Sequence, residues 1–139
     1  MPKVYFDASV IISGLISSIG GSAKLLELVK LQAIIGITSQ TVLDEVLSKS
    51  EKISLSPEKI ALIIKDSKLL VRTRVVPKEI AKYEKQINKE DAHLIAGARL
   101  TKCQYLVSLD KKHVLDPEIK KKFMPLIIVS PKELLELII

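Results

Sequence analysis

Three aspartates stand in this sequence where parallel strands and a helix could bring their carboxylates together. Asp7 directly follows the apolar run Val4–Phe6, Asp110 follows the run Tyr105–Ser108 by two residues, and Asp91 opens a helical pattern. Ligands of open α/β sheets bind beyond the carboxyl ends of the strands, so Asp7 and Asp110 are expected at that edge. Gathered carboxylates repel one another unless a cation lies among them. Mg²⁺ and Mn²⁺ prefer oxygen ligands, so this arrangement predicts a divalent metal site.

Asp91 gives the sharpest signal of the three. It shares a helical stripe with Leu94, Ile95 and Ala98, and a stripe of this kind faces the sheet. The carboxylate then points inward at a helix N-terminus, where the helix dipole favours negative charge. The same position fits a capping residue, or the reciprocal partner of a cap at Asn88. The pattern leaves these interpretations open.

A fourth acid is expected in the helix predicted over Ser39–Leu47. That helix buries its apolar positions, and both Asp44 and Glu45 lie at the margins of the buried stripe. Periodicity therefore does not choose between these two acids, and each also fits a solvated surface position.

The order of elements predicts an α/β fold, a three-layer α/β/α sandwich with a mainly parallel central sheet. β-prone apolar runs alternate with helical patterns, which is typical of parallel sheets covered on both faces. Strands are expected at Val4–Phe6, Ala33–Ile37, Leu69–Val71 (with Val75 and Val76 extending or following it), Tyr105–Ser108 and Leu126–Val129. Helices are expected after a cap at Ser22, over Ser39–Leu47, from Ser56–Pro57 to about Ser67, over Pro77–Gln86 with an exposed surface, over Asp91–Leu100 and over Pro131–Leu137.

Composition narrows the class of protein. The 139 residues are expected to form one domain, 1–139, because no linker or repeat divides them. No apolar run approaches the roughly 20 residues of a membrane span, and no signal peptide is evident, which predicts a cytoplasmic protein without a membrane partner. Cys103 is the only cysteine, so an internal disulfide is excluded. The net charge of +6 is compatible with a nucleic-acid partner, although lysine-rich surfaces also serve solubility.

At this point the motifs resemble the PIN domain family of metal-dependent ribonucleases, which includes the toxins of VapBC-type toxin–antitoxin systems. The likeness is carried in order by VYFDASVIISG with GGSAKLLELV, SQTVLDEVL, EDAHLIAGA and YLVSLDKKHVL. The ending IIVSPKELLEL is similar to the tail of a subgroup described as toxin components.

The resemblance implies an RNA substrate, hydrolysed at its phosphodiester bonds with the help of one or two Mg²⁺ or Mn²⁺ ions. It selects Glu45 over Asp44, and it implies that Ser9 and Ser108 hydrogen-bond to the carboxylates and position them. It also implies an antitoxin partner and is compatible with a homodimer, to which the closing helix could contribute. The implied catalytic and metal-binding residues are Asp7, Glu45, Asp91 and Asp110.

Two positions depart from the family pattern. Ser9 stands where many relatives carry Asn, and His113 stands where many carry an acid. Asp116 could replace that acid only if its loop folds back, and His113 is expected as a surface residue. His93 is expected to be exposed or partly packed. These departures keep open an alternative, a catalytically weak PIN-like module that binds RNA or protein.

Other enzyme classes fit less well. Haloacid-dehalogenase-like phosphatases usually have a second Asp where this chain has Ser9, and receiver domains add an acidic pair before the first helix. Gly14, Gly20 and Gly21 do not form the G-x-G-x-x-G fingerprint of a dinucleotide-binding fold.

Overall fold

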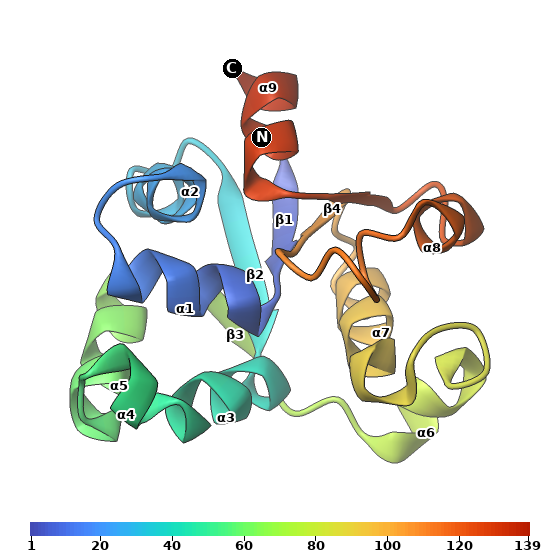
Figure 1. Cartoon of the computed structure of the whole chain (residues 1–139), viewed down its shortest axis with the longest axis horizontal. Helices are drawn as coiled ribbons and strands as arrows, with labels where there is room; N and C mark the ends of the chain where they lie inside the picture. Colours follow the sequence, from blue (N-terminus) through green and yellow to red (C-terminus); the bar gives the residue numbers. More distant parts are fainter.

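The centre of the protein is a five-stranded sheet in which every neighbouring pair of strands is parallel. The computed structural model describes residues 1–139 (Figure 1). The strand order is β3-β2-β1-β4-β5, which puts the first strand in the middle. The strands are β1 (Lys3–Phe6), β2 (Ile35–Ser39), β3 (Leu70–Arg72), β4 (Tyr105–Val107) and β5 (Ile127–Val129).

The helices fall into two groups around this sheet, as in the predicted three-layer α/β/α fold. In Figure 1, α1, α2, α4 and α5 lie to the left of the strands, α3 lies below them, α6–α8 lie to the right, and α9 lies above. The helices are α1 (Ala8–Ile16), α2 (Gly21–Lys30), α3 (Gln40–Ser48), α4 (Ser50–Ile53), α5 (Pro57–Asp66), α6 (Pro77–Ile80), α7 (Ala92–Leu100), α8 (Pro117–Lys122) and α9 (Pro131–Ile138). Two 3₁₀ turns, Ala81–Tyr83 and Lys89–Asp91, separate α6 from α7.

Two glycines show that α2 and α7 cover opposite faces of the sheet. A Cβ on Gly36 of β2 would lie 2.6 Å from Val29 of α2, and a Cβ on Gly97 of α7 would lie 2.5 Å from the Tyr5 ring. Gly36 pairs with Val4, and Val4 and Tyr5 are successive residues of β1. Successive strand residues point to opposite faces, so the two contacts lie on opposite sides of the sheet.

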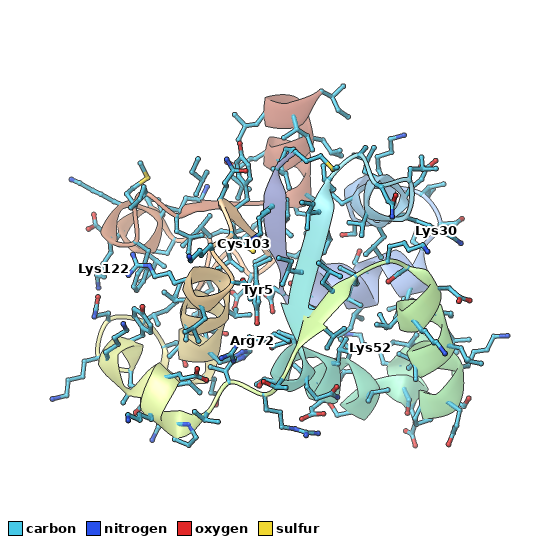
Figure 2. All side chains as sticks on the ribbon, turned by 180° about the vertical axis from the view of Figure 1, so that it is seen from behind. Tyr5, Lys30, Lys52, Arg72, Cys103 and Lys122 are labelled. Atoms are coloured by element: carbon cyan, nitrogen blue, oxygen red, sulfur yellow. The ribbon has the colours of Figure 1, made fainter.

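The core fills both spaces between the sheet and its helices. A cluster of 33 buried apolar residues runs from Val4 to Leu134. Tyr5 and Phe6 of β1 are fully buried, and Tyr5 lies between the strands and α7 in the view from behind (Figure 2). The middle strand is therefore held firmly on both faces, and this fixes the direction in which Asp7 leaves it.

Several predicted element bounds were wrong in detail. The second strand begins at Ile35 rather than Ala33. Ser22 does not cap a helix, because Gly20, with φ of +102°, lets α2 begin at Gly21 and leaves Ser22 buried within the first turn. Val75 is buried but belongs to no strand.

The expected exposed helix Pro77–Gln86 was also wrong. Only the single turn of α6 is α-helical, and the chain then tightens into the 3₁₀ turn that ends at Tyr83. The Tyr83 ring is buried and packs edge-on against Phe123, with 6.2 Å between ring centroids. This tertiary contact overrides the local helical preference. Helix α1, which only the family resemblance implied, and the short helices α4 and α8 were not among the helix ranges predicted from the sequence pattern.

No single helix is long and apolar enough to cross a membrane. The pair α1 and α2 passes the length and composition test only when taken together, and the two helices are bent by 96° at their junction.

Candidate metal centre

Asp7 ends β1 with its carboxylate held by two hydroxyl groups. The residue is only 8% exposed, and its backbone N–H continues the sheet by donating to the Val107 carbonyl. Ser108 Oγ donates to Asp7 Oδ2 at 2.6 Å, and Ser9 Oγ donates to the same oxygen at 3.0 Å. No protein group donates to the other oxygen, Oδ1. One side of this buried carboxylate is therefore fixed, and the other is free to accept a ligand.

The same two serines also fix the loop that carries Asp110. Ser108 Oγ accepts a hydrogen bond from the Asp110 N–H at 3.1 Å, and Ser9 Oγ accepts one from the Leu109 N–H at 3.0 Å. Asp110 Oδ1 in turn accepts from the backbone N–H groups of Lys112 and His113. An aspartate bonded to its own backbone two and three residues on forms a local turn. Asp7 and Asp110 are thus joined through shared hydroxyl groups.

Asp91 occupies the N-cap position of α7, but its side chain makes no capping hydrogen bond. The cap of the preceding 3₁₀ turn is Asn88, whose side chain accepts from the Glu90 N–H, and Asp91 makes no reciprocal bond to it. The capping interpretation is therefore right about the position of Asp91 and wrong about its side chain. Burial first, and then the negative charges of Asp110 and Asp7, raise the pKa of Asp91 to about 6. The carboxylate stands among other acids without a hydrogen-bond donor of its own.

His113 lies closer to the acids than the sequence indicated. One ligand atom from each of Asp91, Asp110 and His113 lies within 4.8 Å of the others. His113 Nδ1 is 3.4 Å from Asp110 Oδ2, and the imidazole side chain is 41% exposed. The prediction of a surface residue was right about exposure but missed this contact. The signal was the spacing, because the turn after Asp110 brings the residue three positions later back over it.

Asp44 and Glu45 have different surroundings. Arg74 Nε donates to Asp44 Oδ2 at 2.7 Å and Arg74 Nη2 donates to Oδ1 at 3.1 Å, so Asp44 is already neutralised on the surface. Glu45 is exposed over much of its length and makes no ion pair. Partial burial of its carboxyl group, and then the charge of Asp7, raise the pKa of Glu45. Electrostatic coupling to Asp7 therefore distinguishes Glu45 from its neighbour.

Asp116 and His93 are the two other residues near the site for which the sequence analysis gave an expectation. Asp116 does not fold back, because its side chain caps α8 by accepting from the N–H groups of Glu118 and Ile119. His93 is partly packed, as expected, and burial lowers the pKa of its imidazole. Its Nδ1 is buried without a hydrogen-bond partner, which the sequence pattern could not have indicated.

Residues 3–112 match the sequence model of a family described as "PIN domain". The chain belongs to the PIN domain family. Among solved structures this PIN domain is similar to the "Crystal structure of VapBC2 from Rickettsia felis bound to a DNA fragment from their promoter", with a TM-score of 0.61 and 17% sequence identity. The match covers 92% of this chain and 98% of that one, and at this identity it shows the fold alone. No curated protein matched the chain.

The chemistry of this PIN domain's acidic edge fits a divalent cation. After burial, the charges of Asp110 and Asp7 raise the pKa of Asp91, and the charge of Asp7 raises the pKa of Glu45. Asp91, Glu45 and the free oxygen of Asp7 have no donor in the protein. Hard divalent cations are the natural partner of such unpaired carboxylate oxygens, and an imidazole nitrogen is a further donor for Mn²⁺.

Proposed function

We propose that the protein is a Mg²⁺- or Mn²⁺-dependent endoribonuclease that hydrolyses RNA phosphodiester bonds at the edge formed by Asp7, Glu45, Asp91 and Asp110. The observation that carries the proposal is the gathering of four carboxylates, which follow β1, lie in α3, precede α7 and follow β4: Asp91 and Asp110 meet beside His113, and the charges of Asp7, Glu45 and Asp91 act on one another. Membership of the PIN domain family and the net charge of +6 support it.

Each residue of the proposed site has a separate role. Asp91 and Asp110 hold the cation together with the free oxygen of Asp7, and Ser9 and Ser108 keep Asp7 in place. Glu45, the most exposed of the four acids, orients the attacking water. When bound, Mg²⁺ or Mn²⁺ lowers the pKa of a water molecule and offsets charge on the phosphate.

Ser108→Ala is expected to weaken Mn²⁺ binding by about 10–100-fold, a range typical of groups that orient metal ligands. The change removes the 2.6 Å hydrogen bond to Asp7 and releases the Asp110 N–H. Ser108→Thr keeps the hydroxyl and should retain most of the affinity. Calorimetric titration of Mn²⁺ into wild type and the two variants measures the affinities. Equal losses of Mn²⁺ affinity in the two variants would show that side-chain packing at Ser108, and not its hydroxyl group, determines binding.

His113 favours Mn²⁺ over Mg²⁺ at this site, because an imidazole nitrogen binds first-row transition metals better than Mg²⁺. We expect His113→Ala to lower Mn²⁺ affinity roughly tenfold and to leave Mg²⁺ affinity within about twofold. His113→Asp, which restores the acid that many relatives carry, should shift the preference toward Mg²⁺. Titration of both metals at pH 7.5 checks this, and an unchanged Mn²⁺/Mg²⁺ ratio in both variants would refute the role.

Toxin activity within a toxin–antitoxin pair is the biological setting that we propose. The similar solved structure is VapBC2 from Rickettsia felis bound to promoter DNA, which supports an antitoxin partner for this chain. We also propose a cytoplasmic location, where an RNA substrate would be available, and a homodimer stays a prediction.

A cleavage assay tests the proposal. The protein is incubated with single-stranded RNA, structured RNA and single-stranded DNA in Mg²⁺ or Mn²⁺, and EDTA and Asp7→Asn serve as controls. We expect RNA cleavage that EDTA and Asp7→Asn both abolish. RNA binding without cleavage in either metal would favour the alternative, a catalytically weak PIN-like binding module. Cleavage that survives Asp7→Asn would show that the acidic edge is the wrong site.

A further inference from the structure

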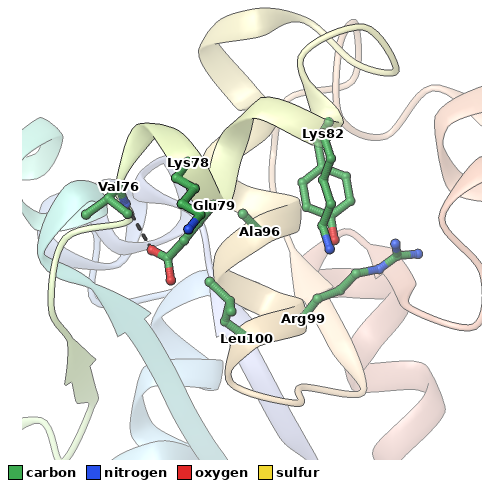
Figure 3. A pocket seen from close by; sticks show the side chains of 8 residues that line it. Val76, Lys78, Glu79, Lys82, Ala96, Arg99 and Leu100 are labelled. Carbon is green, nitrogen blue, oxygen red and sulfur yellow. Dashed lines mark hydrogen bonds between the residues drawn. The ribbon is translucent and has the colours of Figure 1, made fainter.

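A cavity of about 880 Å³ lies between the α6 segment and the C-terminal half of α7, away from the acidic edge (Figure 3). We call it the α6–α7 pocket. It exists because α6 is only one turn long and the chain then turns inward at Tyr83. The eight residues that line it are Val76, Lys78, Glu79, Lys82, Tyr83, Ala96, Arg99 and Leu100.

The pocket carries uncompensated positive charge. Lys78, Lys82 and Arg99 make no ion pair within the protein, whereas the one acid, Glu79, is already bound by Arg72 at 2.7 Å. Glu79 also accepts from the Val76 N–H at 3.0 Å, as Figure 3 shows, so it is turned toward its own segment. The pocket therefore favours an anion.

Arg99 is held in position, while apolar surface stays open beside it. Its guanidinium lies 5.6 Å from the Tyr83 ring centroid and 5.5 Å from that of Phe123, and it donates to the Phe123 carbonyl. Lys82 Nζ lies 5.2 Å from the Tyr83 centroid. Leu100, which follows Arg99 in α7, and Val76, which precedes α6, are 46% and 47% exposed. A ligand with a phosphate and a flat apolar part matches both features.

Helix α7 connects this pocket to the acidic edge. Asp91 stands just before the helix and Arg99 lies eight residues later, about 12 Å along the axis at 1.5 Å per residue. The segment 84–90 between the two places carries Lys85 and Lys89 but also Glu84 and Glu90, so it is neutral overall. Lys122 adds a positive charge beside it through its bond to the Gln86 carbonyl.

We infer that the α6–α7 pocket binds an unpaired nucleotide of the RNA strand, a few nucleotides from the scissile phosphate, with Lys78, Lys82 and Arg99 toward phosphate and Leu100 toward the base. This inference rests on the proposed RNA substrate. An acidic protein segment would satisfy the charges, but its acidic side chains alone would leave the exposed Leu100 and Val76 uncovered beside the fixed guanidinium.

The test is binding of fluorescent single-stranded RNA in EDTA, where cleavage is prevented, over a range of salt concentrations. Lys78→Ala/Lys82→Ala is compared with Lys30→Ala/Lys52→Ala, which removes equal charge from α2 and α4 on the other side of the molecule (Figure 2). We expect affinity to fall about tenfold in the pocket pair only, and its log–log salt slope to decrease by about 1.4 for two lost phosphate contacts. Leu100→Ser should weaken binding about threefold with an unchanged slope.

Equal effects of the two lysine pairs would overturn the inference, because RNA would then sense only net charge. The inference would also be overturned if an acidic peptide bound at the pocket and RNA did not. The binding and cleavage assays test different ideas. If the protein cleaves RNA but the pocket variants bind RNA like the control pair, only the pocket inference fails. If the pocket variants lose RNA affinity but the protein does not cleave RNA, only the nuclease proposal fails.

Discussion

Asp91→Asn is expected to abolish metal-dependent RNA cleavage and, in EDTA at pH 7.5, to make the protein more resistant to denaturant. The wild-type carboxylate costs free energy in the folded state, because burial and the charges of Asp110 and Asp7 raise its pKa from 3.8 to about 6. A shift of this size corresponds to about 3 kcal/mol, which partial exposure and screening reduce to about 1 kcal/mol. Asn keeps the shape and removes the charge.

The stability gain of Asp91→Asn is expected to grow as pH rises. A carboxyl group with a raised folded pKa favours folding while it is protonated, and that contribution is lost as pH rises from 3.8 through about 6. The advantage of Asp91→Asn should therefore be full above pH 7 and vanish near pH 4. Urea unfolding of both proteins at several pH values measures it.

Asp66→Asn, on the exposed surface of α5, is the matched control, and its stability should stay within about 0.5 kcal/mol of wild type. If Asp91→Asn destabilised the protein, the Asp91 carboxylate would be stabilising the fold, which would contradict its proposed role as a metal ligand. Added Mn²⁺ should stabilise wild type and not Asp91→Asn.

Gly97→Ala is expected to cost about 2–3 kcal/mol of folding free energy, within the range for overpacking a core. The new methyl group would overlap the Tyr5 hydroxyl and lie 2.5 Å from Cζ of its ring. This exceeds the gain of up to about 1 kcal/mol from replacing glycine in a helix. Because the contact sets how closely α7 approaches β1, the change should also move Asp91 away from Asp7 and weaken Mn²⁺ binding.

A second substitution separates the clash from other causes. The Tyr5 hydroxyl is buried without a hydrogen-bond partner, and burial raises its pKa to about 12. Tyr5→Phe alone should therefore be close to neutral, and in the double variant it should recover about 1 kcal/mol or more of the loss. Gly14→Ala is the control, since the only close approach of its methyl group would be to the movable end of Leu26, and the Ser22 carbonyl would lie at an ordinary 3.5 Å. Strictly additive effects of Tyr5→Phe and Gly97→Ala in urea unfolding would contradict this packing.

The sequence predicted the parallel sheet and placed Asp7 and Asp110 after strand ends, because apolar runs and strand ends are local signals. Asp7 and Asp110 fall at neighbouring strand ends because β1 pairs with β4, which no local pattern encodes. Asp91 stayed ambiguous for a similar reason. Capping and inward orientation share one sequence pattern, and only the free carboxylate excludes the first.

The misses came from contacts between distant segments. Tyr83 leaves the expected helix to pack on Phe123, 40 residues later, and the α6–α7 pocket is a consequence. His113 contacts the acids through a turn set by backbone bonds to Asp110. Asp44 and Glu45 could be distinguished in sequence only by family resemblance, since the pairing of Asp44 with Arg74 spans 30 residues.

The most direct test is a crystal structure of the protein grown with Mn²⁺ and measured for anomalous scattering from manganese. The proposed metal centre predicts a manganese peak bounded by Asp91, Asp110 and His113, the three residues whose ligand atoms lie within 4.8 Å of one another. The account would be contradicted if the carboxylates at that edge were well ordered and no manganese peak lay among them, or if manganese bound only elsewhere on the protein.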